Sequence, residues 1–287
     1  MVGRSWRRPA VDALKEQGLS QHRACYLAGM TENGYRYRRK PSVLNEAILQ
    51  RMRELARKHP RYGFPRLHYL VCRDIQPVNR KRVYRLYVQN NLQVRQRRRA
   101  KRKLGLGERG VLPAAERPNQ VWVMDFIEDR LLNGRKYRCL NIEDVYTREL
   151  LECDVALSIG GARVTRVLDM VCALRGAPEK IVSDNGSEFT SKAVMIWTTR
   201  TRTAHHFIDP EKPMQNGYME SLNGKMRDEH LNAQMPLTIN EAKQMIEDWR
   251  NHYNNERPHS SLKNLTPREY ALKQVEKLTF PTTQKMG

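Results

Sequence analysis

The segment Val121-Trp-Val-Met-Asp-Phe-Ile127 decides the fold class of this 287-residue chain. Its β-branched and aromatic residues predict a strand that is buried on both faces. Asp125 interrupts this apolar run. A cation must meet the side chain, because a buried carboxylate without a partner costs several kcal/mol. A Lys or Arg partner is the simplest explanation for one such aspartate, and the segment alone leaves that alternative open.

An α/β pattern continues from this strand. Asn133-Gly134 is typical of a tight hairpin turn, so the first strands are expected to pair antiparallel. Strands are predicted at 121–127, 137–145, 150–157, 180–183 and 204–208, and helices at 161–175, from about 214, and after the capping box Thr238-x-x-Glu241. Trp249 and Tyr253 lie at helical spacing and are expected in the core. The pattern predicts layers of helices around a mixed sheet.

The region before this pattern is predicted to be all-α. Ser20 and Thr31 can each cap a short helix, which is typical of a helix-turn-helix, although a plain helical hairpin fits as well. A second helical region follows, in which Asn79 caps a helix with one basic face. That face holds the first candidate DNA contacts, which are Arg80, Lys81, Arg82 and Arg85.

The net charge of +21 comes from the same N-terminal third. Residues 1–110 hold 28 Lys and Arg against 7 Asp and Glu, whereas residues 111–287 hold 24 of each kind. Seven of the ten residues 94–103 are basic, including Arg97, Arg98 and Arg99. A solvated basic surface is the alternative, but clustered arginines favour nucleic acid as the partner. We therefore predict that 93–118 is a basic linker that contacts DNA.

Other compositional features narrow the protein class. The five cysteines are odd in number and form no Cys-x-x-Cys pair, which favours a reducing compartment without disulfides or zinc. No apolar run approaches the ~18 residues that span a bilayer, and the first residues lack a secretory signal. We expect a soluble, cytoplasmic, nucleoid-associated protein without a membrane partner.

Two further carboxylates change the interpretation of Asp125. Asp184 follows a predicted strand at Asp184-Asn-Gly186, where a sharp turn leaves its side chain outward. Glu220 lies on a predicted helix whose apolar side is elsewhere. Three converging carboxylates repel one another and need divalent cations, and all-oxygen ligands select Mg²⁺ or Mn²⁺. The three acids are therefore predicted to form one metal site.

Three motifs around these acids resemble those of a known protein family. These are Trp122-Val-Met-Asp-Phe126, Ser183-Asp-Asn-Gly-Ser-Glu-Phe189, and Lys212-Pro-Met-Gln-Asn-Gly-Tyr-Met-Glu220, with 35 residues between Asp184 and Glu220. They resemble the catalytic core of the retroviral-integrase superfamily, whose D,D(35)E group is named for that spacing. Arg61-Tyr-Gly-Phe-Pro-Arg66, Val78-Asn-Arg-Lys-Arg-Val-Tyr84 and the tail 253–267 resemble the second-frame (orfB) transposase of bacterial insertion sequences of the insertion-sequence-three family. The resemblance extends over about residues 45–271.

The resemblance implies an RNase H-like fold with a mixed five-stranded sheet flanked by helices. The expected division is a helix-turn-helix-like segment at 1–42, a second helical DNA-binding domain at 43–92, the linker, the catalytic core at 119–234, and a C-terminal helix and tail at 235–287. Asp125, Asp184 and Glu220 would ligate two Mg²⁺ ions, which Mn²⁺ can replace, and catalyse DNA cleavage and strand transfer. Implied partners are the terminal inverted repeats, target DNA, further copies of the chain, and the first-frame (orfA) product or a fusion to it.

Residues beside the three acids carry further expectations. Lys212, Asn216, Lys225 and Arg227 are candidate contacts to DNA near the scissile phosphate, while exposed helix cations without a specific role are the alternative. Glu188 is expected to cap the helix that follows it. Adjacent strand residues point in opposite directions, so His205 and His206 are expected to be bystanders.

The chain departs from the family pattern at two places. Thr198–Ala204 lacks the glycine usual before the strand, and Glu211 replaces a loop glycine. An active transposase is the first hypothesis. The second is a catalytically weak DNA-binding repressor that occupies the element ends, and the third is a nuclease of the same fold that hydrolyses DNA without joining it.

Overall fold

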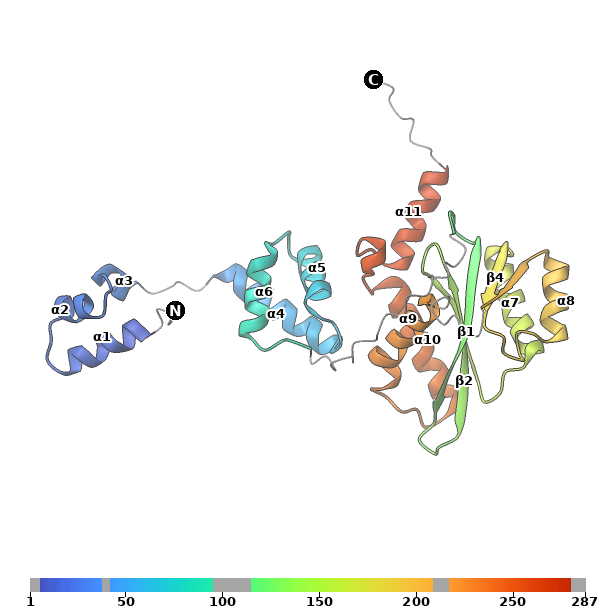
Figure 1. Cartoon of the computed structure of the whole chain (residues 1–287), viewed down its shortest axis with the longest axis horizontal. Helices are drawn as coiled ribbons and strands as arrows, with labels where there is room; N and C mark the ends of the chain where they lie inside the picture. The colour runs from blue at the N-terminus through green and yellow to red at the C-terminus, as the bar shows by residue number, and fades with distance from the viewer. Residues whose placement is uncertain (1–5, 38–41, 95–114, 209–216, 280–287) are drawn as a thin grey trace, which may run out of the picture. The chain divides into compact units, whose positions relative to one another are not determined.

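The structure is a computed structural model that describes residues 6–37, 42–94, 115–208 and 217–279 (Figure 1). The chain divides into two compact units, residues 1–50 and 51–287. This division falls within the helix α4 (Val43–Lys58), and the five-part division expected from the sequence stays a prediction. Among the helices of the described residues, none has the length and apolar character needed to cross a membrane.

The first unit contains three short helices around a small core. Ser20 and Thr31 cap α2 and α3 as predicted, because their hydroxyls accept hydrogen bonds from backbone N–H groups. The core consists of Val11, Ala24, Cys25, Ala28 and Tyr35. The helices are α1 (Arg7–Glu16), α2 (Gln21–Leu27) and α3 (Glu32–Arg36).

The second unit begins within α4 and continues into two more helices. Asn79 caps α6 as predicted, with its side chain accepting a hydrogen bond from the Lys81 backbone N–H at 2.9 Å. Apolar residues at helical spacing are buried in each helix, including Met52, Leu67 and Val83. The helices are α4 (Val43–Lys58), α5 (Phe64–Asp74) and α6 (Arg80–Gln89).

The centre of the second unit is a five-stranded mixed sheet. β1 and β2 form the predicted hairpin, and Gly134 has the positive φ of 81° that its turn requires. The strand order is β3-β2-β1-β4-β5, with β2 antiparallel to β1 and β3, and with β1, β4 and β5 parallel. The strands are β1 (Val121–Arg130), β2 (Lys136–Asp144), β3 (Leu150–Ala156), β4 (Lys180–Ser183) and β5 (Ala204–Phe207).

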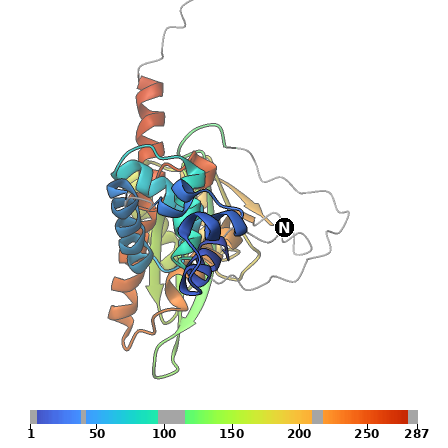
Figure 2. The ribbon, with the colours of Figure 1, turned by 90° about the vertical axis from the view of Figure 1, so that its left-hand side faces the viewer.

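Helices cover both faces of this sheet (Figure 1). Val123 and Ile127 of β1 pack toward α9 and α10, whereas Trp122 and Met124 pack toward α7 and α8. The helices are α7 (Gly161–Arg175), α8 (Lys192–Thr201), α9 (Gly217–Met226), a π-helix (Arg227–Leu231), α10 (Ile239–Asn255) and α11 (Pro267–Thr279). In Figure 1 and Figure 2, α11 projects beyond the other helices of this unit.

The architecture confirms the predicted fold class, a mixed five-stranded sheet flanked by helices and preceded by an all-α region. Trp249 and Tyr253 lie in the core as expected. The missing glycine has a visible consequence at the end of α8. Arg202 adopts the left-handed conformation there (φ 55°, ψ 33°), which glycine adopts at lower cost.

Candidate active site

Asp125 lies on β1 and points toward the face that α9 covers. Its Oδ1 accepts a hydrogen bond from the Phe126 backbone N–H at 2.8 Å, and its Oδ2 accepts one from Asn223 Nδ2 at 2.8 Å. Burial raises the pKa of Asp125 to about 6. The charges of Asp184 and Glu220 add to this rise, while the two hydrogen bonds oppose it.

Asp184 directly follows β4, the parallel neighbour of β1. The register pairs Val123 with Val182, so Asp125 and Asp184 each lie two residues beyond a paired position on adjacent strands. Asp184 is exposed, and its Oδ1 accepts a hydrogen bond from the Gly186 backbone N–H at 2.9 Å. The two aspartates therefore lie at the same edge of the sheet.

Glu220 lies in the first turn of α9 and is exposed. Asn223 follows it by three residues, so both side chains lie on the same side of the helix. Asn223 hydrogen-bonds Asp125, and this contact brings the helix face that carries Glu220 to the edge that carries the aspartates.

The three carboxylates have no cationic partner within the described parts of the chain. No described Lys, Arg or His nitrogen lies within 4.0 Å of their oxygens. The Lys or Arg partner considered for Asp125 is therefore absent from the described residues. The oxygens of the three acids do not all lie within 4.8 Å of one another. Like charges repel, so closer approach of these groups requires a cation.

Asn141 and Asn223 were not among the predicted site residues. Asn141 lies opposite Asp125 in the β1–β2 register and is completely buried. Its Nδ2 donates a hydrogen bond to Asn223 Oδ1 at 2.9 Å. The one signal in the sequence was a polar residue in an apolar strand of the predicted hairpin.

Glu188 differs from its prediction. Ser191 caps α8, with its hydroxyl accepting a hydrogen bond from the Val194 backbone N–H at 3.4 Å. The Glu188 carboxylate instead pairs with the Arg138 guanidinium, which holds the pKa of Glu188 below its usual value. The capping prediction was wrong because an arginine on β2 is a stronger partner than a backbone N–H. His205 Nε2 lies 2.9 Å from Ser183 Oγ, and its expected role as a bystander stays a prediction.

The predicted DNA contacts lie in several environments. On α6, Arg80, Lys81 and Arg85 are exposed, and Arg82 is half-buried. The predicted contacts Arg97, Arg98, Arg99, Lys212 and Asn216 lie outside the described residues.

The two predicted contacts at the end of α9, Lys225 and Arg227, differ from each other. Arg227 is exposed, and its guanidinium donates to the Glu128 backbone carbonyl at 2.8 Å. Lys225 is half-buried, and burial, with the charge of Arg257, lowers its pKa to about 8, while Glu143 opposes this change. Both DNA contacts stay predictions.

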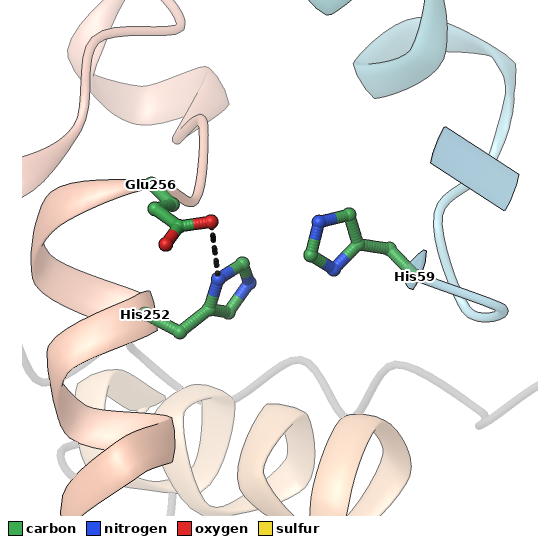
Figure 3. A group of neighbouring side chains, drawn as sticks. All are labelled: His59, His252 and Glu256. Atoms are coloured by element: carbon green, nitrogen blue, oxygen red, sulfur yellow. Dashed lines mark ion pairs between the residues drawn. The ribbon is translucent and has the colours of Figure 1, made fainter. Parts of the chain in front are cut away.

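A second cluster in this unit contains His59, His252 and Glu256, with potential ligand atoms within 4.8 Å of one another (Figure 3). His252 Nδ1 lies 3.4 Å from Glu256 Oε2, and His252 Nε2 lies 2.9 Å from the Tyr62 hydroxyl. The Lys58 ammonium donates to the same Glu256 oxygen at 2.7 Å. Since the carboxylate already has a cation and His252 has partners on both nitrogens, the cluster is explained by ion pairing and hydrogen bonding.

Family models match most of the second unit. Two models described as "Integrase core domain" match residues 115–213 and 201–267, and one described as "HTH-like domain" matches residues 44–100. The integrase matches cover β1 through the segment after α10, and therefore contain all three acids.

Proteins of bacterial insertion elements are similar over nearly the whole chain. A protein of insertion element IS476 from Xanthomonas euvesicatoria is 43% identical over 90% of this chain and 74% of its own length. A protein of insertion element IS407 from Burkholderia multivorans is 41% identical over 92% of this chain and 95% of its own length.

Among solved structures, the HTLV-2 integrase catalytic core in complex with magnesium is 18% identical, with a TM-score of 0.45, over 55% of this chain and 99% of that one. The sequence relatives and the family models together show that the chain carries an integrase core. The chain belongs to the transposase family of bacterial insertion sequences, of the second-frame type found in insertion-sequence-three elements.

Proposed function

We propose that this chain is a DDE transposase that cleaves DNA at the ends of its insertion sequence and joins those ends to new phosphodiesters. The observation that carries the proposal is the gathering of Asp125, Asp184 and Glu220 at one sheet edge without a described cationic partner. Buried or clustered carboxylates that serve only structure are normally paired. Unpaired carboxylates at one edge are suited to binding divalent cations.

The residues fit a pair of Mg²⁺ ions, or Mn²⁺ ions in their place. Asp125, Asp184 and Glu220 would hold them, because hard cations prefer carboxylate oxygens. Burial, together with the nearby charges of Asp184 and Glu220, raises the pKa of Asp125, and this rise supports the assignment. When bound, such ions supply activation of the attacking oxygen and stabilisation of the leaving oxygen.

The reaction then needs two displacements at phosphorus. In the first, water attacks a phosphodiester at the element end, one P–O bond forms, another breaks, and a DNA 3′-hydroxyl leaves. In the second, that 3′-hydroxyl attacks a different phosphodiester, and the displaced 3′-oxygen takes up a proton. Neither step forms a covalent bond between the DNA and a protein side chain. The chain's contribution is to align the reacting groups, which is the main source of rate in such transfers.

Basic residues outside the acids would bind the polyanionic substrate. Arg227 lies seven residues after Glu220, at the start of the π-helix that directly follows α9, and is exposed. The exposed basic residues of α6 suit the phosphate backbone. We propose the terminal inverted repeats and target DNA as substrates, in the bacterial cytoplasm, with several copies of the chain and the first-frame product or fusion in the complex.

The test is strand transfer by the purified chain, using labelled linear duplexes that carry the terminal inverted repeats of its own element. We expect joining that requires Mg²⁺ and is lost in Asp184→Asn. Asp154→Asn is the matched control, because Asp154 makes a bidentate ion pair with Arg163 at 2.6 and 2.8 Å. The control should join DNA as the wild type does.

Two outcomes would contradict the proposal. Hydrolysis without joining would identify a nuclease. Salt-sensitive binding of the ends without Mg²⁺-dependent cleavage would identify a DNA-binding repressor.

A further inference from the structure

A chain of three hydrogen bonds leads from the core to Asp125. Asn141 Nδ2 donates to Asn223 Oδ1 at 2.9 Å, and Asn223 Nδ2 donates to Asp125 Oδ2 at 2.8 Å. The Cys139 thiol lies 3.2 Å from Asn141 Oδ1. These residues come from β2, α9 and β1, so the contacts join three separate elements.

The direction of these hydrogen bonds follows from the chemistry of the groups. An ionised carboxylate only accepts, so Asn223 must present its NH₂ group to Asp125. The Asn223 oxygen then faces Asn141, which must donate as well. The Asn141 oxygen is left to accept from the Cys139 thiol. One orientation of both amides satisfies every group, and reversing either amide would place like atoms together.

Burial makes Asn141 a costly residue for a structural role alone. Its exposed fraction is 0%, and its surroundings include Cys139 and Met226 of the apolar core. An amide in such a place costs free energy unless it is hydrogen-bonded, and an apolar side chain of similar size would avoid this cost. The amide therefore points to a role that packing does not supply.

The hydrogen bonds restrict the Asp125 carboxylate. The Phe126 backbone N–H holds Oδ1, and Asn223 holds Oδ2. Each carboxylate oxygen has further acceptor capacity, so both remain able to bind a cation. Because Asn223 lies three residues after Glu220, the same contact also ties Glu220 to Asp125.

We propose that Asn141 is a positioning residue for the active site. It orients the Asn223 amide, and Asn223 in turn holds Asp125 in the direction needed for divalent-cation binding and in register with Glu220. This inference rests on the proposed function, in which Asp125 is a metal ligand.

The principal variant is Asn141→Leu, which keeps the approximate volume and removes the donor. We expect strand-transfer kcat to fall about 10- to 100-fold with little change in KM for DNA, as expected when catalytic alignment is lost. The Mg²⁺ concentration for half-maximal rate should rise several-fold. Asn254→Leu is the matched control, because Asn254 makes two 2.9 Å hydrogen bonds to the Leu150 backbone, and no catalytic role is assigned to it.

The second experiment uses the variant Asn223→Ala, which changes a half-buried helix position. If Asn141 acts through Asn223, the double variant Asn141→Leu/Asn223→Ala should have the Mg²⁺ dependence of Asn223→Ala alone. Multiplying losses would overturn the inference, as would an unchanged Mg²⁺ dependence in Asn141→Leu or the same change in Asn254→Leu.

Direct binding of Mn²⁺, followed by electron paramagnetic resonance without DNA, separates this inference from the proposed function. Weaker Mn²⁺ binding in Asn141→Leu than in both wild type and Asn254→Leu supports the inference, even if the wild type joins no DNA and the proposed function fails. If Asn141→Leu binds Mn²⁺ as well as the wild type does, the inference is overturned, and the proposed function is unaffected as long as the wild type joins DNA. A wild type that binds no Mn²⁺ overturns the inference and the metal assignment together.

Discussion

The acids of the proposed active site and Glu229, which lies just after α9, differ in their partners. Asp125 and Glu220 have no cationic partner among the described residues. Nine residues after Glu220, the Glu229 carboxylate accepts from Arg257 at 2.6 and 2.7 Å and from Arg66 at 3.0 Å. Glu220 and Glu229 lie on the same continuous helical segment, 217–231.

The difference shows that one helical segment carries both an acid without a described cationic partner and an acid in a structural ion pair. Arg257 is 1% exposed and Glu229 has a side chain 10% exposed, so their ion pair is a buried structural contact. Burial raises the pKa of Glu229, but its hydrogen bond and ion pair with Arg257 more than offset this, and the pKa is lowered overall. The pKa of Asp125 changes in the opposite direction because no arginine compensates its burial. Charge that the fold leaves uncompensated is available to a metal ion.

The largest expected effect is loss of strand transfer in Glu220→Gln. Removing a proposed metal ligand should lower the rate at least about 1,000-fold, which corresponds to about 4 kcal/mol of transition-state stabilisation. Since Glu220 is exposed and has no described partner, thermal unfolding should change little. Joining by Glu220→Gln at a rate close to that of the wild type would remove this residue from the active site.

The next effect is on stability, at the paired acids. Arg257→Met leaves Glu229 buried without its bidentate partner, and should lower the free energy of unfolding by about 3–5 kcal/mol. Urea denaturation measures this change. Arg163→Met is the control, because the Arg163 pair with Asp154 is more exposed and should contribute less than about 1 kcal/mol. Equal losses in the two variants would contradict the contrast drawn between the regions.

A third effect is a pH dependence specific to the unpaired acids. The pKa of Asp125 is raised, so its ionisation opposes folding increasingly as pH rises from its usual value toward about 6. Mg²⁺ competes with the proton and should offset this penalty only where Asp125 is ionised. At a Mg²⁺ concentration of five times Kd, the stabilisation above pH 6 should be about 1 kcal/mol. Scanning calorimetry should show this Mg²⁺ effect fading below pH 6, and a constant effect from pH 5 to pH 8 would exclude Asp125 as a ligand.

The smallest effect is expected away from both groups of acids. Arg202→Gly removes the backbone strain of the left-handed conformation at the end of α8, whereas glycine adds entropy to the unfolded chain. The net effect should raise the free energy of unfolding by about 0.5 kcal/mol. Strand transfer should be unchanged. A lowered melting temperature would show that the Arg202 side chain makes a contribution larger than its backbone strain.

The strands and helices were predictable because they depend on local patterns. The predicted helix at 161–175 and strand at 180–183 match α7 and β4 residue for residue. The caps Ser20, Asn79 and Thr238 were also correct, since capping involves neighbours within a few residues. The roles of the three acids stay a prediction, which the electrostatic coupling at Asp125 supports.

The side-chain partners were far harder to predict. Glu188 pairs with Arg138, which is 50 residues away, and Asn141 with Asn223, which is 82 residues away. Lys225 was expected at DNA, yet it lies close enough to Glu143 for the two charges to affect each other's pKa. Such pairs depend on the register of β2 against β1 and on where α9 packs against the sheet, and no local sequence pattern specifies either.

The amino-acid sequence by itself determined where the strands and helices lie, which residues cap them, and that Asp184 and Glu220 stand 35 residues apart, because these properties depend on periodicity and spacing along the chain. Only the tertiary structure decided which acids receive an arginine and which receive only hydrogen bonds. Burial and partner geometry are set when distant segments pack together, and these two quantities determine whether a carboxylate stabilises the fold or remains available for a cation.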